Sequence, residues 1–284
     1  MSRRKFMPKL LVVKFGTDNL SSYLSNVRDE GGKMKRSLDP QIFSDYARQI
    51  VELYRRRTKI IIVTSGAIRA GEERVERLAR RASDFAKKEL AAIGTRHLLN
   101  QWGEAFENEG IEIAPIWVTF QNWNDEGERE SIKSSILNLL RQGVIPVVNE
   151  NDVVSDWEIK WMEKGISEND RLTKAISFLI GADAVLFLTN GEGVYEDNPE
   201  TNSQARLYDE VSMWGDLKRL INSSAGISEG GSGGMRVKLE TAVSCAKKGM
   251  EVAIAGREID AIVKFAKGES VGTRIGQTTK FRVC

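Results

Sequence analysis

Short, continuously apolar segments alternate with longer amphipathic segments along most of this chain. Apolar segments of this kind, bounded by glycine or polar residues, are typical of strands that are buried on both faces of a sheet. They lie at residues 10–15, 59–64, 111–118, 144–148, 184–188 and 251–255. The strand–helix–strand order therefore predicts an α/β fold, a three-layer αβα sandwich around a mainly parallel sheet.

The amphipathic segments carry recognisable helix boundaries. Asp39 and Pro40 provide an N-cap residue and a proline at the first helical position, and glycines 143, 181 and 249 stop three later segments. The spacing of apolar residues predicts helices at residues 40–57, 84–107, 131–142, 171–180 and 235–248. Two glycine-containing segments, residues 21–36 and 226–234, are predicted to be flexible loops.

Composition excludes several classes of protein. The 284 residues carry 42 Lys+Arg against 40 Asp+Glu, and a net charge of +2 gives no strong electrostatic footprint for nucleic acid. The longest apolar stretches fall far short of the ~18 residues that a membrane-spanning helix needs. Two cysteines cannot build a disulfide framework or a metal site by themselves. We therefore expect a cytoplasmic protein with no nucleic-acid or membrane partner and no metal held by its own side chains.

Glycine and polar residues follow four of the predicted strands. The segments are residues 14–17, 64–67, 149–152 and 189–191. Ligands of parallel sheets bind beyond the carboxyl ends of the strands, where glycines let backbone N–H groups approach an anion. Ordinary turn residues would also follow strands, so one such end is weak evidence. Four together, with Lys14 on the first strand, favour an anionic ligand.

The glycine-rich segment 226–234 holds five glycines in nine residues and runs into the predicted helix that contains Lys238. Such a loop and helix start can cradle a phosphate, although a mobile surface segment would show the same glycines. The chain has no G-x-x-x-x-G-K-[ST] motif, and no G-x-G-x-x-G follows the first strand. Phosphoryl transfer needs positive charge around the moving group. Lys14 and Lys238 could supply it from two sides, with Asp170 holding both.

Five segments, in this order, resemble the amino-acid kinase family. They are residues 12–17, 63–68, 146–152, 169–170 and 232–238. Within the family, Asn-Glu-Asn-Asp at 149–152 and Gly-Gly-Met-x-x-Lys at 233–238 resemble the glutamate 5-kinase branch. The similarity extends over nearly the whole chain.

The resemblance implies the amino-acid kinase fold and ATP-dependent phosphorylation of the γ-carboxylate of L-glutamate to L-glutamyl 5-phosphate, the first step of proline biosynthesis, with Mg²⁺. It implies catalytic roles for Lys14, Lys238 and Asp170. The implied glutamate site consists of Ser65, Gly66, Ala67, Asn149, Asp152 and Asn169. The implied nucleotide site consists of Lys14, Gly16, Thr189, Asn190, Ser232, Gly233, Gly234, Met235 and Lys238.

Several positions depart from the family pattern. Asp18 stands where serine is usual, and Asn190 and Glu168 each stand where aspartate is usual. Residues 120–124, Phe-Gln-Asn-Trp-Asn, replace a basic and acidic run that lies near the acceptor in relatives. Two alternatives therefore stay open: a kinase of this family that acts on another small acidic acceptor, and a non-catalytic nucleotide-binding regulatory module.

The resemblance also implies a domain organisation. We expect one kinase domain over residues 1–284, with an acceptor-binding part at about 1–188 and a nucleotide-binding part at about 189–276. Many members of the branch continue into a small RNA-binding-type (PUA) domain, for which residues 277–284 leave no room. Relatives self-associate, so a homo-oligomer, dimer or tetramer, is expected.

Overall fold

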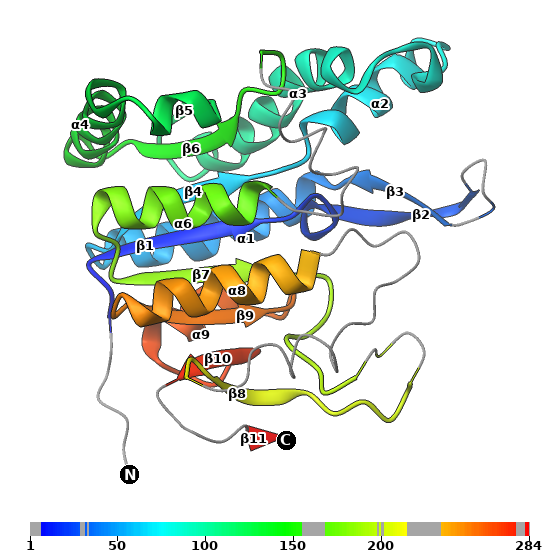
Figure 1. Ribbon diagram of the computed structural model, residues 1–284. Coiled ribbons are helices and arrows are strands. Elements are labelled where there is room, and N and C mark those ends of the chain that lie inside the picture. Colours follow the sequence, from blue (N-terminus) through cyan, green and yellow to red (C-terminus); the bar gives the residue numbers. More distant parts are fainter. Residues whose placement is uncertain are drawn as a thin grey trace.

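One large sheet runs through the molecule (Figure 1). The computed structural model describes residues 7–28, 32, 34–154, 168–197, 199, 202–214, 234–276 and 282–283. The strands of the sheet in these ranges are β1 (Leu10–Phe15), β4 (Lys59–Thr64), β5 (Ile113–Val118), β6 (Ile145–Glu150), β7 (Ala184–Leu188), β8 (Tyr208–Ser212), β9 (Glu251–Ala255), β10 (Thr273–Gly276) and β11 (Arg282–Val283). Their spatial order is β11-β8-β10-β9-β7-β1-β4-β6-β5. The strands from β9 to β5 are parallel, and β10 is antiparallel to β9, so the predicted mainly parallel sheet is confirmed.

Helices cover both faces of the sheet. The helices are α1 (Pro40–Arg55), α2 (Ala67–Arg77), α3 (Lys87–Glu107), α4 (Glu126–Gln142), α6 (Glu168–Ile180), α8 (Gly234–Lys247) and α9 (Ala261–Lys267). Residues of α1, α2, α3 and α9 share one hydrophobic cluster with Leu11, Val13 and Phe15 of β1. Residues of α4 and α6 share another with Val12, on the opposite face of the same strand, and α8 packs on that side through β7 and β9. The three-layer architecture is therefore as expected.

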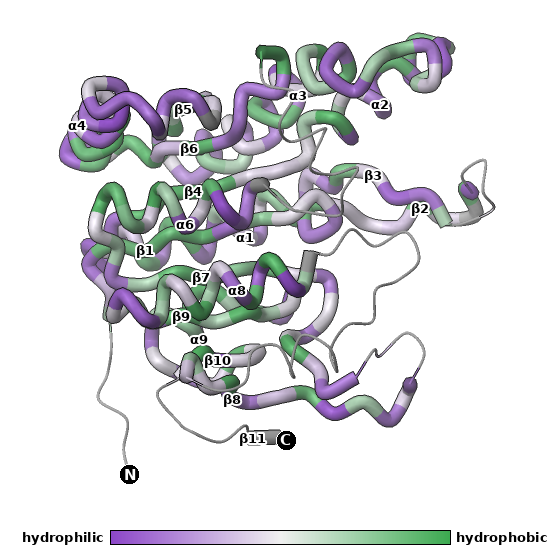
Figure 2. Tube along the Cα trace, viewed as in Figure 1, coloured by the Kyte–Doolittle hydropathy of each residue, from purple (hydrophilic) through white to green (hydrophobic). Residues whose placement is uncertain are grey.

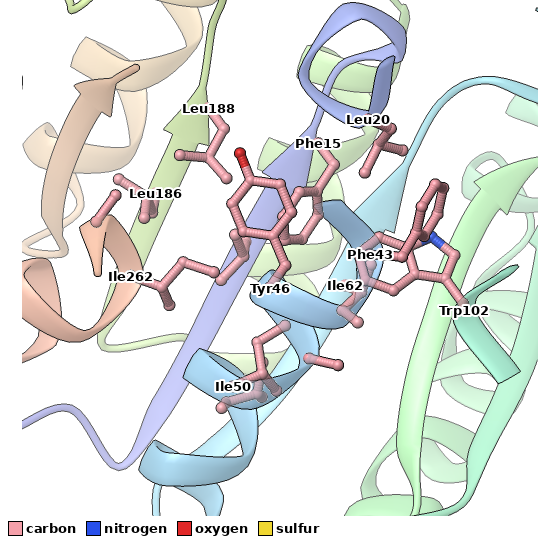
Figure 3. Close-up of a cluster of buried hydrophobic side chains, with 14 of the residues drawn as sticks. Phe15, Leu20, Phe43, Tyr46, Ile50, Ile62, Trp102, Leu186, Leu188 and Ile262 are labelled. Atoms are coloured by element: carbon pink, nitrogen blue, oxygen red, sulfur yellow. The ribbon is translucent and has the colours of Figure 1, made fainter. Parts of the chain in front are cut away.

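The core places aromatic residues directly beneath the carboxyl edge of the sheet (Figure 3). Trp102 of α3 makes edge-to-face contacts with Phe15 and Phe43, at centroid distances of 5.0 and 4.8 Å. Its indole Nε1 donates a hydrogen bond to Thr64 Oγ1 at 3.1 Å, which fixes the last residue of β4. Figure 2 shows hydrophobic residues gathered along β7 and β9, whereas α4 is largely hydrophilic.

Several helices differ from their predicted bounds; α1 ends at Arg55 rather than at residue 57, and α6 begins at Glu168 rather than at residue 171. The helix predicted at 84–107 begins at Lys87, and a separate helix, α2, precedes it. Helix α2 was not predicted because it packs through Ala67, Ala70 and Gly71, which leave little periodic signal from large apolar side chains. The helix predicted to begin at residue 131 begins at Glu126, because the Asp125 carboxylate accepts the backbone N–H of Glu128 at 2.8 Å and caps it.

The segment predicted as a flexible loop at 21–36 is a β-hairpin. Strand β2 (Ser21–Arg28) pairs antiparallel with β3 (Met34–Leu38) and extends away from the body of the molecule, at the right of Figure 1. The hairpin lies outside the main sheet and is largely solvent-exposed, so its strands do not show the continuous apolar pattern. The second predicted loop, 226–234, lies outside the described residues except for Gly234, which opens α8.

Strands of both predicted halves, before and after residue 188, belong to the same sheet. Their assignment to acceptor and nucleotide remains a prediction. No helix among the described residues is long and apolar enough to cross a membrane.

Candidate active site

Lys14 points toward the face of the sheet that α6 and α8 cover. Side chains alternate along a strand, so Lys14 lies on the same face as Val12, whose cluster includes Leu172 of α6. β1 is paired on both sides, with β4 and β7, and Lys14 is only 4% exposed. A buried ammonium group on a central strand needs a compensating charge from that layer.

Asp170, in the first turn of α6, provides that charge and is shared by a second lysine. Lys14 Nζ lies 3.2 Å from Asp170 Oδ1. Lys238 Nζ, from α8, donates to Asp170 Oδ1 at 3.0 Å and to Oδ2 at 3.1 Å. All three side chains are buried. The structure thus brings together the three residues that the sequence singled out, from three different elements.

The electrostatics of this cluster leave positive charge in excess. Burial alone would raise the pKa of Asp170, but the attraction of Lys14 and Lys238 outweighs burial and holds that pKa below its usual range. Burial is also the main reason why the pKa of Lys238 falls to about 8, although Asp170 opposes the change. Two ammonium groups face one carboxylate here, so a negatively charged ligand beside them would balance the site.

The residues predicted to bind the acceptor meet at the neighbouring strand end. Asn169 Nδ2 donates to Ser65 Oγ at 2.7 Å, which joins the start of α6 to the end of β4. Gly66 adopts a φ of +114°, a conformation that side-chain-bearing residues rarely adopt, and it directly precedes α2. The first N–H groups of a helix have no intrahelical partner. Helix α2 therefore presents its N-terminus beside Ser65, which suits a carboxylate.

Asn149 and Asp152 lie at the end of β6, the next strand of the sheet. β6 was predicted to end at residue 148, and it continues through Asn149 to Glu150, paired with Trp117 and Val118 of β5. Asn149 and Asp152 are both buried. The side-chain oxygen of Asn149 has no hydrogen-bond partner among the described residues. It is an acceptor available to a ligand that carries a donor group.

The segment that departs most from the family pattern, residues 120–124, lies beyond β5. It forms a short 3₁₀ helix (Phe120–Trp123), where the Asn122 side-chain oxygen accepts from the Thr119 backbone N–H at 2.5 Å. Asn122 Nδ2 donates to Glu128 Oε2 at 2.6 Å. β5 pairs in parallel with β6, the strand that carries Asn149. The segment that follows β5 therefore lies at the same edge of the sheet as Asn149.

Thr189 and Asn190 follow β7, on the other side of β1. The Thr189 backbone N–H donates to the carbonyl of Ala255 at 2.8 Å, and its own carbonyl accepts from Asn19 Nδ2 at 2.7 Å. Asn19 belongs to a 3₁₀ helix (Thr17–Leu20) after Gly16, and its side-chain oxygen also accepts the Gly16 N–H at 3.3 Å. The Gly16 N–H is therefore engaged within the protein rather than free for an anion.

Two predicted nucleotide-site residues, Ser232 and Gly233, lie outside the described residues, while Gly234 and Met235 form the first turn of α8. Sequence reasoning did not identify Asn19, and it placed an anion-binding strand end at Gly66 without predicting that helix α2 begins there. No local motif marks Asn19, because its partner Thr189 is 170 positions away. The start of the helix itself has only a weak signal, a glycine directly between an apolar strand and a charged segment.

Comparison with known proteins identifies the class. Residues 9–256 match the sequence profile of the amino acid kinase family, and the chain belongs to that family. Among its relatives are proteins named glutamate 5-kinase from Photobacterium profundum and Dehalococcoides mccartyi. The first is 36% identical over 278 residues, 96% of this chain and 69% of the relative. The second is 38% identical over 269 residues, 94% of this chain and 68% of the relative. The chain thus spans about two thirds of the length of these relatives.

Solved structures show the same fold at much lower sequence identity. UMP kinase from Bacillus anthracis aligns with a TM-score of 0.60 and 13% identity, over 98% of this chain and 99% of its own. An isopentenyl phosphate kinase aligns with a TM-score of 0.55 and 20% identity, over 94% of this chain and 100% of its own. The three-layer sandwich is therefore the fold of these kinases.

Proposed function

We propose that this protein is a glutamate 5-kinase: it transfers the γ-phosphoryl group of ATP to the γ-carboxylate of L-glutamate. The observation that carries the proposal is the buried Lys14–Asp170–Lys238 cluster at the carboxyl edge of the central strands. Relatives named glutamate 5-kinase cover 94% or more of the chain, which supports the same assignment. The product, glutamyl 5-phosphate, is the starting compound of proline biosynthesis, an activity of the cytoplasm.

The residues of the cluster match the demands of the reaction. A γ-carboxylate oxygen of glutamate attacks the γ-phosphorus of ATP, a new O–P bond forms, and the bond to the bridging oxygen breaks as ADP leaves with the electron pair. Negative charge spreads over the transferred group, and Lys14 and Lys238 stabilise it from two elements. Asp170 holds both ammonium groups in place.

No general base is required, because a carboxylate is already ionised near neutral pH. The single histidine of the chain, His97, lies on α3. Its pKa is lowered mainly by burial and, to a smaller extent, by the positive charges of Arg96, Arg74 and Arg77. The reaction as proposed needs no proton transfer from this side chain.

Glutamate would bind across the ends of β4 and β6. The N-terminus of α2 after Gly66, together with Ser65 and Asn169, suits the carboxylate groups, and the side-chain oxygens of Asn149 and Asp152 suit the α-ammonium group. Thr189, Asn190 and the start of α8, with residues 232–233, would line the ATP site.

Mg²⁺ would enter with the nucleotide. Within the described ranges, no three His, Cys, Asp or Glu side chains converge as metal ligands, and both oxygens of Asp170 are engaged by lysines. This arrangement fits an ion that is held chiefly by phosphate oxygens, as is usual for Mg²⁺ in phosphoryl transfer. When bound, the ion would neutralise charge on the phosphates.

The test is an acceptor panel with ATP and Mg²⁺. ADP release is measured with L-glutamate, L-aspartate, L-glutamine and glutarate, and hydroxylamine traps an acyl phosphate as a hydroxamate. L-Glutamate is expected to give both ADP and hydroxamate. Glutamine lacks the γ-carboxylate and should give neither, while glutarate lacks the ammonium group and should react weakly. Turnover with another acid but not with glutamate would contradict the proposal and favour the family member with a different acceptor that the segment 120–124 leaves open.

We also propose a homo-oligomer, dimer or tetramer. Sedimentation velocity of the purified chain checks this directly, and a single species with the mass of one chain would contradict it.

A further inference from the structure

The loops that follow β1 and β7 are joined by side-chain hydrogen bonds at consecutive positions. Asn190 Nδ2 donates to Asp18 Oδ2 at 2.9 Å, and Asn19 Nδ2 donates to the carbonyl of Thr189 at 2.7 Å. The pairing of β1 with β7 ends with Lys14 opposite Phe187. The two side-chain hydrogen bonds therefore hold the loops together beyond the point where the backbone pairing of β1 with β7 ends. We refer to Asp18, Asn19, Thr189 and Asn190 as the seam clasp.

The inner half of the seam clasp, the bond from Asn19 to Thr189, is buried and lies beside the ammonium group of Lys14. Asn19 is 3% exposed, and its amide uses both ends, accepting from the Gly16 N–H and donating to Thr189. A Cβ placed on Gly16 would lie 3.6 Å from Lys14 Nζ, so the loop that Asn19 holds passes directly next to that group. Asn19 thus fixes the distance between the Lys14 loop and the end of β7.

The outer half of the seam clasp, the bond from Asn190 to Asp18, has a fixed donor and a fixed acceptor. The Asp18 carboxylate can only accept, so Asn190 must donate. Arg36 of the hairpin and Arg69 of α2 lie 3.7 and 3.9 Å from Asp18 Oδ1, which holds the negative charge on the β1 side. Positions 18 and 190 are two of the places where the sequence departs from the family pattern, and here they bond to each other.

We propose that Asp18 and Asn19 are positioning residues that hold the end of β7 against the Lys14 loop and thereby set the nucleotide site. The inference rests on the proposed function, because it assigns the end of β7 to ATP. The acceptor residues lie at the ends of β4 and β6, on the other side of β1. Loss of the seam clasp should therefore weaken ATP binding and leave glutamate binding nearly unchanged.

A charge exchange across the seam clasp tests this proposal. Asn190→Asp places two carboxylates face to face and removes the only donor of the pair. We expect the KM and the dissociation constant for ATP to rise about tenfold, the effect of losing one hydrogen bond to a charged group, while the KM for glutamate changes less than about twofold. Adding Asp18→Asn to this variant restores a donor opposite the new carboxylate at position 190. The double variant should therefore bind ATP at least about threefold more tightly than Asn190→Asp, although Arg36 and Arg69 lose their partner at position 18.

The decisive comparison is between the single and double variants. ATP dissociation constants are measured by titration calorimetry, with KM and kcat for both substrates and the thermal midpoint of each variant. A double variant that binds ATP as weakly as Asn190→Asp would overturn the proposal, since the loss would then come from the contact of position 190 with ATP rather than from its bond to Asp18. Unchanged ATP binding in Asn190→Asp would overturn it as well. If the unaltered chain bound no ATP, the proposed function would fail together with the inference, whereas the two preceding outcomes leave the proposed function intact.

Discussion

Lys238 is the residue whose protonation state should be visible in the kinetics. Its pKa is lowered mainly by burial to about 8, and only the protonated form can stabilise charge on the transferred phosphoryl. We expect kcat/KM for glutamate to fall as the pH rises through about 8. Lys238→Arg keeps its charge in this range, so any activity that it retains should lack this fall. A flat profile of the unaltered protein to pH 10 would exclude Lys238 as the titrating group.

The same lowered pKa has a consequence for stability. The Lys238 pKa drops from 10.5 in the unfolded chain to about 8, so the unfolded state binds more protons between these two values. The cost of burying this group is present below about pH 8 and is relieved as the pH rises toward 10.5. Lys238 therefore makes its least favourable contribution to stability where it is best suited to catalysis.

Asp170 should contribute to stability in the opposite direction. Asp170→Asn leaves two buried ammonium groups without their carboxylate, and removal of one partner from such a cluster costs roughly 3–5 kcal/mol. We expect a loss of this size in the free energy of unfolding, measured with urea at pH 7. Asp45→Asn, which breaks an exposed ion pair with Arg48, is the matched control and should cost about 0–1 kcal/mol.

The pH dependence of unfolding checks the assignment to Asp170. Its pKa is lowered below the unfolded value of 3.8, so its contribution is fully present above about pH 4 and is lost as the pH falls through the folded value. The difference between the unaltered chain and Asp170→Asn should shrink in that range. Equal losses for Asp170→Asn and Asp45→Asn would show that the buried cluster contributes no more than a surface pair.

At the residue scale, the sequence predicts the residues of the Lys14–Asp170–Lys238 cluster better than it predicts the residues around them. Lys14 was identifiable because a charged residue near the end of an apolar strand is unusual, and alternation along β1 then directs it toward α6. Lys238 was identifiable from the glycine-rich segment that runs into its helix, and Asp170 was predicted as the carboxylate between the two lysines. Asn19 could not be predicted, since a buried amide that joins two loops has no local signature until the strands are placed side by side.

At the scale of elements, the packing of α2 on α3 depends on two glycines. A Cβ on Gly94 would lie 1.8 Å from the Ala67 carbonyl oxygen, and one on Gly71 would lie 1.9 Å from that of Leu90. The two helices are therefore in backbone contact. Ala67 is the first residue of α2, so this contact also sets where the helix N-terminus lies beside Ser65.

Gly94→Ala should therefore lower stability and acceptor affinity together. The added methyl group must push α2 away, and we expect a loss of roughly 2–4 kcal/mol in urea unfolding and a raised KM for glutamate. Gly103→Ala is the control on the same helix. A Cβ there meets nothing within 4 Å, so helix propensity should leave stability unchanged or raise it by up to about 1 kcal/mol. Similar stability of the two variants would contradict the close helix contact.

The elements that sequence reasoning predicted and missed differ in how they are buried. The central strands β1, β4, β7 and β9 bury aliphatic side chains on both faces, and this produces the continuous apolar runs that were predicted with accurate bounds. Helix α2 and the β2–β3 hairpin are ordered by small residues and by polar contacts such as Glu73 with the Leu38 N–H, at 2.8 Å. Neither produces a hydrophobic period.

At the scale of the whole molecule, β1 is the middle of the structure. It is hydrogen-bonded to a strand on each side, all six of its residues are buried, and clusters pack on both of its faces. The hairpin, in contrast, is a separate two-stranded sheet with exposed side chains. These two elements should open with very different free energies.

Amide hydrogen exchange can measure this difference. Amides of β1 should exchange only through global unfolding, with an opening free energy equal to the free energy of unfolding from urea denaturation. Amides of the β2–β3 hairpin should exchange through local openings of much lower free energy. Mass spectrometry of exchanged peptides resolves both regions. Rapid exchange in β1 under native conditions would contradict its central role.

Lys14 is therefore carried by the part of the chain that is last to open. The acceptor residues on β6 lie one strand from the edge strand β5, so fluctuations that fray this edge reach them first. On gentle warming, glutamate affinity should fade while the ammonium group of Lys14 keeps its position. Loss of activity in the first stage of heating would then be reversible, because β1 is still folded and the site can re-form around it.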